Sequence, residues 1–244
     1  MSNGEASASG MPAGGPHFLE SEWVIWEHRS PDKNSKSYED NMEKLCEVAT
    51  VEDFWRAFNN IPKPSNIFFD GRTRKRFANR SVESFSLFKK NIKPEWEDAA
   101  NRTGAEWFCR KMFPAQQLVR AAPCAPFRIP RPEQPSSLVL VLSVVYVGVR
   151  LTAAAMFCSL STVLAPQDDF WQNLVLGMIG ETIDTADEIC GARVVDKSTG
   201  SRQMYRLELW FKRKDQAVAD ELLQRMCTAL GPTAKSCKWE FRPH

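Results

Sequence analysis

The sequence predicts an α+β domain in which helices pack on one face of a single sheet. Six segments have the composition of strands, and most alternate apolar and polar residues as in a sheet buried on one face. Three helical patterns lie among them, and no strand–helix–strand unit repeats regularly, which argues against a parallel sheet. The predicted strands are 23–28, 85–90, 105–111, 192–197, 203–213 and 237–242.

Each predicted helix begins at a polar residue. Thr50 with Asp53 is a helix start signal, and apolar residues follow it at helical spacing. Asp168 or Asp169 opens the second helix, and Asp215 opens the third. The apolar positions that define the three helices are Val51, Phe54, Trp55 and Phe58; Trp171, Leu174, Val175, Met178 and Ile179; and Val218, Leu222, Leu223 and Met226.

Composition limits the class of protein. The 244 residues are enough to bury a core without disulfides, and the formal net charge is only +2. A nucleic-acid role would therefore rest on a local pocket rather than on a broad basic surface. The seven cysteines form no C-x-x-C motif and the three histidines are far apart, so neither a metal site nor a cofactor is expected. Scattered thiols fit a reducing compartment, and we expect a cytoplasmic protein.

The chain divides into a domain and two other segments. Residues 1–16 are rich in Gly, Ala and Ser, which predicts a disordered arm rather than a signal peptide. The domain would comprise 17–111 and 168–244, because the composition changes abruptly between them: 112–167 has no Asp or Lys and contains seven of the fifteen prolines.

The second half of this atypical insertion is apolar. Residues 138–164 are long enough to cross a bilayer, but one span would put the two halves of the sheet on opposite sides. We therefore expect no stable membrane association. Two interpretations remain: a disordered or loosely packed insertion, or translated intronic sequence.

The step from Trp96 to Glu97 pairs a flat aromatic surface with a carboxylate. A base stacked on the indole can turn its edge to the carboxylate, which accepts two N–H donors, as guanine supplies. A second ring on the other side would favour guanine methylated at N7, whose positive charge adds a cation–π attraction. The pattern predicts a purine reader, although a buried Trp beside a surface Glu is the ordinary alternative.

Strand alternation adds two cations. Arg206 and Trp210 fall on the face opposite the apolar residues of the 203–213 strand. The turn at 198–201 would bring Lys197 beside them, which suits a polyphosphate. The alternative is a pair of solvated basic residues at a hairpin.

Seven ordered motifs then identify a family. They are W-V-I-W at 23–26, T-V-E-D-F-W at 50–55, P-E-W-E-D at 94–98, W-Q-N-L at 171–174, I-G-E at 179–181, I-C-G-A at 189–192 and L-E-L-W at 207–210. Their order and spacing resemble the eukaryotic translation initiation factor 4E family, which binds the 7-methylguanosine cap of messenger RNA. The resemblance implies a curved antiparallel sheet with three helices on its convex face and the cap pocket on the concave side.

The resemblance assigns roles to single residues. Tyr38 would be the second stacking ring, where most members have Trp, and this Tyr resembles the divergent 4E-homologous subclass. Glu106 stands where the commonest members carry a basic residue, so one phosphate contact is expected to be missing. The full set implied for the cap is Tyr38 and Trp96 as stacking rings, Glu97 as edge acceptor, Trp210 against the N7-methyl group, and Lys197 and Arg206 as phosphate ligands.

The resemblance also implies a partner surface on the convex side, which would take an amphipathic helix from the initiation scaffold 4G or from 4E-binding proteins. Trp55 would be its anchor, and the alternative for Trp55 is core packing. Asn173 stands where the family's acidic partner contact usually lies. The implied residues are His17, Leu19, Val51, Trp55, Asn173 and Leu176.

The function implied is cap recognition in translation initiation, without catalysis. One alternative is a cap-binding translational repressor. A nucleotide-hydrolysing enzyme is less favoured because the acids are dispersed and no phosphate-binding glycine loop is present; an inactive product is a further alternative. The basic run at 72–76 either contacts RNA beyond the cap, acts as a nuclear signal or is simply a solvated loop.

Overall fold

The computed structural model describes residues 15–31, 37–70, 72–77, 80–112, 166–184 and 186–244. The strands form one antiparallel sheet in the order β2-β1-β3-β5-β6-β4-β7. The strands are β1 (Phe18–Arg29), β2 (Met42–Thr50), β3 (Val82–Lys89), β4 (Ala105–Met112), β5 (Ile189–Asp196), β6 (Met204–Phe211) and β7 (Trp239–Pro243).

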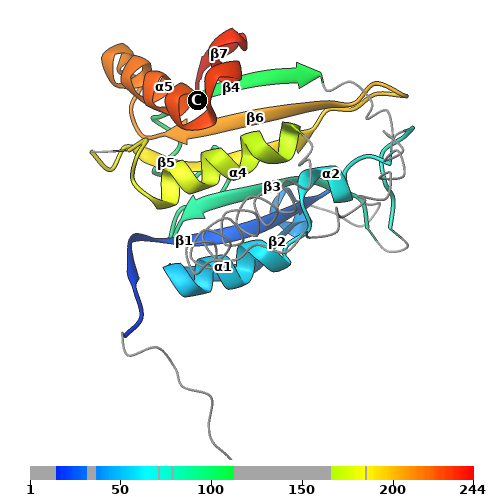
Figure 1. Cartoon of the computed structure of the whole chain (residues 1–244), viewed down its shortest axis with the longest axis horizontal. Coiled ribbons are helices and arrows are strands. Elements are labelled where there is room, and N and C mark those ends of the chain that lie inside the picture. The colour runs from blue at the N-terminus through cyan, green and yellow to red at the C-terminus, as the bar shows by residue number, and fades with distance from the viewer. Residues whose placement is uncertain (1–14, 32–36, 71, 78–79, 113–165, 185) are drawn as a thin grey trace, which may run out of the picture.

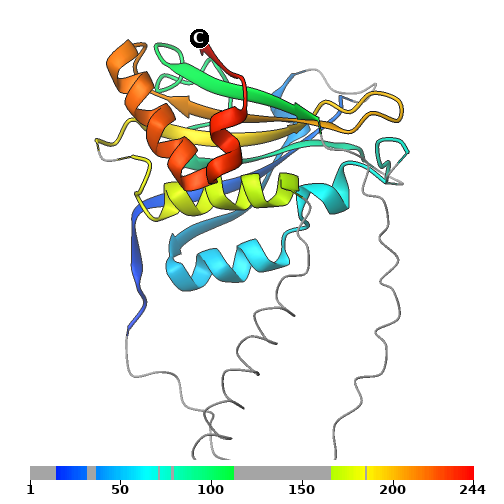
Figure 2. The same ribbon diagram turned by 45° about the horizontal axis from the view of Figure 1, so that its top comes forward.

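The helices of the described residues cover one face of this sheet (Figure 1). They are α1 (Val51–Asn60), α2 (Pro64–Ile67), α4 (Pro166–Ile179) and α5 (Gln216–Leu230), with 3-10 turns at Glu39–Asn41 and Pro232–Ser236. Figure 2 shows the same layers turned, with α4 lying between α1 and α5 over the curved sheet. The predicted fold class, a curved antiparallel sheet with three helices on one face, is confirmed.

Alternation along the strands separates the two faces of the sheet. Phe85, Val194 and Leu209 point to the helices and belong to the main apolar core. The neighbouring residues in each strand, such as Arg193 and Trp210, point to the opposite face. That uncovered face is where a ligand can approach the sheet.

Two of the predicted helix starts are confirmed. The Thr50 hydroxyl accepts a hydrogen bond from the Asp53 N–H at 3.1 Å, and the Asp215 carboxylate accepts one from the Val218 N–H at 3.0 Å. Such caps satisfy backbone donors that the first turn leaves unpaired.

The predicted start of the second long helix, at Asp168 or Asp169, is wrong by two or three residues. α4 begins at Pro166, so Asp168 lies inside its first turn. The Asp168 carboxylate accepts from the Ser65 N–H at 2.9 Å and from the Ser65 hydroxyl at 2.5 Å. It therefore ties α4 to α2 instead of capping its own helix.

Some expectations fall outside the described residues. These are residues 1–14 of the predicted arm and residues 113–165 of the predicted insertion. Their boundaries stay predictions. Among the helices of the described ranges, none is both long and apolar enough to cross a bilayer.

Candidate functional site

A pocket of about 420 Å³ opens on the uncovered face of the sheet. Its walls come from the connections β1–β2 and β3–β4 and from β1, β3, β5 and β6. The lining residues are His28, Arg29, Tyr38, Glu83, Ser84, Pro94, Glu95, Trp96, Glu97, Arg193, Val195, Lys197 and Trp210. Five of the six residues predicted for the cap are among them.

Trp96 projects from a loop that its own neighbours hold. The buried Asn101 amide donates to the carbonyls of Lys93 and Glu95, both at 2.8 Å, and Asp98 accepts the Lys93 N–H at 3.0 Å. These bonds fix the backbone on both sides of Trp96, whose side chain stays 47% exposed. The loop therefore presents a large aromatic surface to solvent at little further cost in conformational entropy.

Two side chains at the other end of the chain support Trp96. The His244 ring stacks with the indole at 6.0 Å between centroids, and the Arg242 guanidinium lies 4.9 Å from its centroid. An Arg at this distance from an indole is a cation–π contact. The residues of β7 and its C-terminal extension thus help to set the tilt of the Trp96 ring.

Tyr38 is held by its hydroxyl rather than by packing. Arg193 donates to the Tyr38 oxygen at 2.9 Å, so the Tyr38 proton is directed at His28 Nδ1, 3.2 Å away. His28 Nε2 then donates to the Ser86 hydroxyl at 2.7 Å. Burial, and then the charge of Arg193, lower the pKa of His28 to about 3, so this ring is neutral at pH 7. The Tyr38 ring remains 48% exposed.

An ion pair links the two loops that carry these rings. The Lys93 ammonium bonds the carboxylate of Glu39, the residue after Tyr38. Both side chains are about half exposed, so the pair contributes little to stability. Its consequence is geometric, because it connects the Tyr38 loop to the Trp96 loop across the pocket.

Glu97 and Trp210 complete the aromatic end. Glu97 is exposed at the pocket rim, and no hydrogen bond or ion pair of its carboxylate occurs within the described residues. Trp210 is buried in the floor, donates its N–H to Glu208 at 3.0 Å and meets Phe88 edge to face. A planar ligand would therefore find a free acceptor at the rim and an apolar wall beneath.

Lys197 lines the pocket, as predicted, and Arg206 does not. Arg206 is 7% exposed and bonds two carboxylates, Glu106 at 2.5 Å and Glu208 at 2.9 Å. Burial, and then the charge of Arg206, lower the pKa of Lys197. The structure thus places Lys197 at the pocket and holds Arg206 in an internal ion pair, and the phosphate contact expected of each stays a prediction.

Arg193 is a pocket residue that the sequence analysis missed. Its guanidinium lies 5.3 Å from the Trp210 ring, donates to Glu208 at 2.9 Å and also holds Tyr38. An Arg within a mostly apolar strand gives no local signal of this role. The strand period could have placed it beside Glu208, because the two residues are partners in the β5–β6 pairing.

Glu106 completes the ion network under the pocket. It is fully buried and bonds both Arg206 and Arg242, while its other oxygen has no partner in the described part of the chain. Burial, and then the charge of Glu208, raise the pKa of Glu106 to about 7. Although burial opposes ionisation, Arg193 and Arg206 hold the pKa of Glu208 below its ordinary value.

The predicted partner residues gather on the helical face. Val51 is 38% and Trp55 40% exposed, although Phe54, which lies between them, is buried against the core. Trp55 therefore lies at the edge of the core and keeps a large apolar surface exposed to solvent. α1 and α4 lie side by side on this face (Figures 1 and 2), and Asn173 and Leu176 belong to α4.

The N-terminal residues of this surface lie against α1. The His17 ring pairs with Glu52 at 2.6 Å, and the His17 carbonyl accepts the Val51 N–H at 2.8 Å. Leu19 and Leu176 pack partly against the main core. Asn173 is half-buried. All six predicted residues thus belong to one side of the molecule, opposite the pocket.

The pocket is suited to recognition. Across the described ranges, no group of three or more His, Cys, Asp or Glu side chains converges as a metal site would require. Two exposed rings, a free carboxylate, an exposed lysine and an aromatic floor can hold a flat, cationic, phosphate-bearing ligand.

Comparison with known proteins identifies relatives. The chain matches the family model of eukaryotic initiation factor 4E over residues 18–120 and 154–244. It is similar to eukaryotic translation initiation factor 4E1 of Drosophila melanogaster, with 31% identity over 176 residues, 72% of this chain and 44% of that protein. The chain spans about half the length of the curated relatives it matches.

Solved structures share the fold. A complex of Ascaris suum eIF4E-3 with m7G cap superposes with a TM-score of 0.59 at 21% identity, covering 94% of this chain and 92% of that one. A complex of C. elegans eIF4E-3 with the 4E-binding protein Mextli and cap analog gives 0.56 at 22% identity, covering 88% and 86%. At these identities the likeness establishes the architecture alone.

Proposed function

Because the chain belongs to the eukaryotic initiation factor 4E family, we propose that it binds the 7-methylguanosine cap of messenger RNA in the cytoplasm and acts in translation initiation. The observation that carries the proposal is the pocket's pair of half-exposed rings, Tyr38 and Trp96, with the unpaired carboxylate of Glu97 at the rim. The mechanism is recognition, and no bond is made or broken.

The two rings take the methylated base between them. N7-methylation gives guanine a positive charge, and each ring face attracts it. A stacked base contributes about 1–3 kcal/mol by alanine substitution, so two rings account for most of the affinity of a nucleotide. Glu97 accepts the N1–H and amino N–H donors of the guanine edge, and Lys197 meets the phosphates.

The partner function rests on the helical face. We propose that Trp55 and Val51 anchor an amphipathic helix from the initiation scaffold 4G or from a 4E-binding protein. Their exposure supports this, because an exposed indole on the outer side of a helix is a typical anchor for a partner. A 4E-binding protein is present in the complex of the C. elegans relative.

A translational repressor is the second candidate. The pairing of Arg206 with Glu106 and Glu208 favours it, because this pairing withdraws one cation from the phosphate end of the pocket. Such a repressor would bind the cap, with lower affinity for its phosphates, and would recruit the initiation scaffold poorly.

The test compares the affinities for 7-methyl-GTP and for GTP, each measured by the quenching of tryptophan fluorescence. The unaltered chain is expected to prefer 7-methyl-GTP. Trp96→Ala is expected to lose this preference because it removes a ring face, and Glu97→Ala is expected to lose affinity for both nucleotides because they share the guanine edge. Trp55→Ala removes an equally exposed indole from the opposite face and is the matched control. Equal affinity for both nucleotides, or wild-type binding by Trp96→Ala, would sink the proposal.

A further inference from the structure

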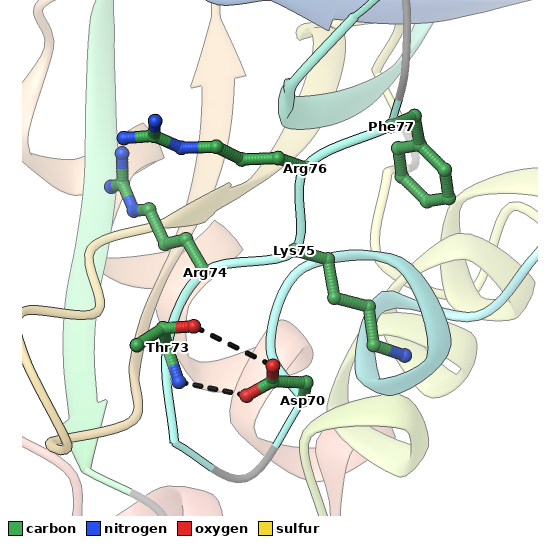
Figure 3. A pocket seen from close by; sticks show the side chains of 6 residues that line it. All are labelled: Asp70, Thr73, Arg74, Lys75, Arg76 and Phe77. Atoms are coloured by element: carbon green, nitrogen blue, oxygen red, sulfur yellow. Dashed lines mark hydrogen bonds between the residues drawn. The ribbon is translucent and has the colours of Figure 1, made fainter.

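A second cavity, of about 540 Å³, lies in the loop between α2 and β3. Figure 3 shows the six side chains that line it. We call residues 70 and 72–77 the basic loop, since they include four cations and a single carboxylate. The lining residues are Asp70, Thr73, Arg74, Lys75, Arg76 and Phe77.

The basic loop is fixed at three points. The Asp70 carboxylate accepts the N–H groups of Arg72 and Thr73, both at 2.7 Å, which closes the turn. Arg74 and Lys75 then anchor the segment that follows. The Arg74 guanidinium bonds the Asp196 carboxylate at 2.9 Å and its carbonyl at 2.6 Å, and Lys75 donates to the Asn66 carbonyl at 2.5 Å.

Two cations remain after this anchoring. The side chains of Arg72 and Arg76 are exposed, and neither guanidinium makes an ion pair or hydrogen bond in the part of the chain that the structure describes. In Figure 3 the guanidinium groups of Arg74 and Arg76 extend to the same side, and Lys75 points away from them. An unpaired guanidinium on a fixed loop is well suited to phosphate, which it contacts with two parallel N–H groups.

The same loop exposes an aromatic ring. Phe77 is 43% exposed, and the Arg80 guanidinium lies 5.8 Å from its centroid. Exposed rings interleaved with cations bind single-stranded nucleic acid, because bases stack on the rings while the cations follow the backbone.

The loop lies beside the phosphate end of the pocket. Arg74 holds Asp196, and the next residue, Lys197, lines the pocket. Figures 1 and 2 both show the segment after α2 at the same end of the sheet as the β5–β6 hairpin. A strand that leaves the pocket past Lys197 therefore meets the basic loop next.

We infer that the basic loop binds the phosphodiester backbone of the RNA nucleotides that follow the cap, with Phe77 offering a stacking surface to one of their bases. The inference rests on the proposed function and extends it from the cap to the adjoining RNA. The chemistry recognised is single-stranded phosphodiester, without base sequence. An import receptor, which takes an extended basic segment, is disfavoured because Arg74 and Lys75 are already tied to the domain.

The experiment compares the affinity for 7-methyl-GTP with that for a capped single-stranded RNA, over a series of salt concentrations. The RNA has about ten nucleotides, so that it can extend from the pocket to the basic loop. In the double variant Arg72→Ala with Arg76→Ala, affinity for 7-methyl-GTP is expected to stay unchanged. The slope of log affinity against log salt for the capped RNA should become shallower by about 0.7 for each phosphate that is no longer neutralised, about 1.4 in all. Phe77→Ala should lower the affinity for the capped RNA at every salt concentration without changing the slope.

The matched control is Lys235→Ala with Lys238→Ala, which removes two exposed cations near β7 and should leave the slope unchanged. A double loop variant that binds capped RNA with an unaltered slope would overturn the inference, because the two arginines would then neutralise no RNA phosphate. If the unaltered chain binds no 7-methyl-GTP, the proposed function fails and the inference falls with it. Because 7-methyl-GTP is measured separately, the two failures are distinguishable.

Discussion

At the scale of single residues, the hydroxyl of Tyr38 distinguishes this pocket from one closed by a tryptophan. The hydroxyl joins Arg193 to His28 and so fixes the angle of the ring, whereas an indole at this position could not make both bonds. The smaller ring gives less stacking surface. Its pre-arranged orientation offsets part of that loss, because less conformational entropy is lost on binding.

Tyr38→Phe is therefore expected to weaken 7-methyl-GTP binding although it keeps the ring. The phenyl ring loses the bonds to both Arg193 and His28, so its orientation must be fixed on binding. Ordering one side chain costs about 1 kcal/mol, so the loss of affinity should be roughly fivefold. Isothermal titration of both chains would measure it. Tyr205→Phe, which removes a hydroxyl bonded to Gln203 on the helical face, is the control and should leave the affinity unchanged. Equal binding by Tyr38→Phe and the unaltered chain would show that the ring needs no such anchor.

Glu106 makes stability depend on pH. Burial, and then Glu208, raise its pKa from the ordinary 4.5 to about 7, so between these values the folded chain keeps a proton that the unfolded chain releases. The folded state therefore loses stability as the pH rises through this window, at up to about 1.4 kcal/mol per pH unit. Below pH 4.5, the ordinary pKa, the stabilisation from protonated Glu106 is fully present.

Glu106→Gln is expected to abolish that dependence. Urea unfolding of both chains below and above this window should show the variant gaining stability relative to the unaltered chain as the pH rises. Glu240→Gln, which removes a half-exposed carboxylate on β7, serves as the control, and its stability should change with pH as that of the unaltered chain does. A stability difference that does not change with pH would mean that Glu106 is ionised throughout the range.

At the scale of elements, α1 divides its apolar residues between two tasks. Phe54 is buried and belongs to the core, whereas Trp55 stays at the surface. The sequence alone left both interpretations of Trp55 open, because a residue at helical spacing can lie at the margin of the buried stripe.

Trp55→Ala should bind a scaffold peptide of the form Y-x-x-x-x-L-Φ, where Φ is any apolar residue, much more weakly than the unaltered chain does. Its affinity for 7-methyl-GTP should stay unchanged. Truncation of an anchor aromatic typically costs about 2 kcal/mol or more, roughly thirtyfold in affinity. Fluorescence anisotropy of a labelled peptide would report it. Trp96→Ala is the reciprocal control, expected to keep the peptide and lose the nucleotide. If Trp55→Ala unfolds the chain, Trp55 is a core residue.

The alternation of apolar and polar residues could predict the strands that are buried on one face. β2 was missed because it lies at the edge of the described sheet, next to β1, and carries three charged residues. Its pattern is therefore that of a solvated segment. Within the pocket, Trp96 and Glu97 were predictable since they are adjacent in sequence. The pairing of Arg206 with Glu106 was not, because these residues are one hundred positions apart and meet only across β4 and β6.

At the scale of the whole molecule, the sheet separates the two proposed binding surfaces. The pocket and the basic loop are reached from the uncovered face and one end of the sheet, and the proposed partner surface lies over the helices. Trp210 and Phe211, adjacent in β6, contribute to the pocket floor and to the core respectively. Residues of the two surfaces can therefore be changed separately, as the reciprocal variants above require.

The last prediction concerns residues 113–165, which include none of the residues assigned to either surface. β4 ends and α4 begins at the same end of the sheet (Figure 1), so a connection of about four to six residues, typical of compact domains, can join them. A chain in which a short polar linker replaces 113–165 is expected to fold and to bind 7-methyl-GTP as the full chain does. Thermal unfolding and nucleotide titration would measure both properties.

A milder deletion, of residues 121–153, is the control, because the family match stops at 120 and resumes at 154. If both shortened chains bind, the cap-binding domain consists of the two flanking segments and the predicted boundaries hold. If only the milder deletion binds, 113–120 and 154–165 belong to the domain and the predicted insertion is too long. Should neither fold while the full chain binds 7-methyl-GTP, the whole insertion is an integral part of the domain, because the sheet and helices then cannot close without it.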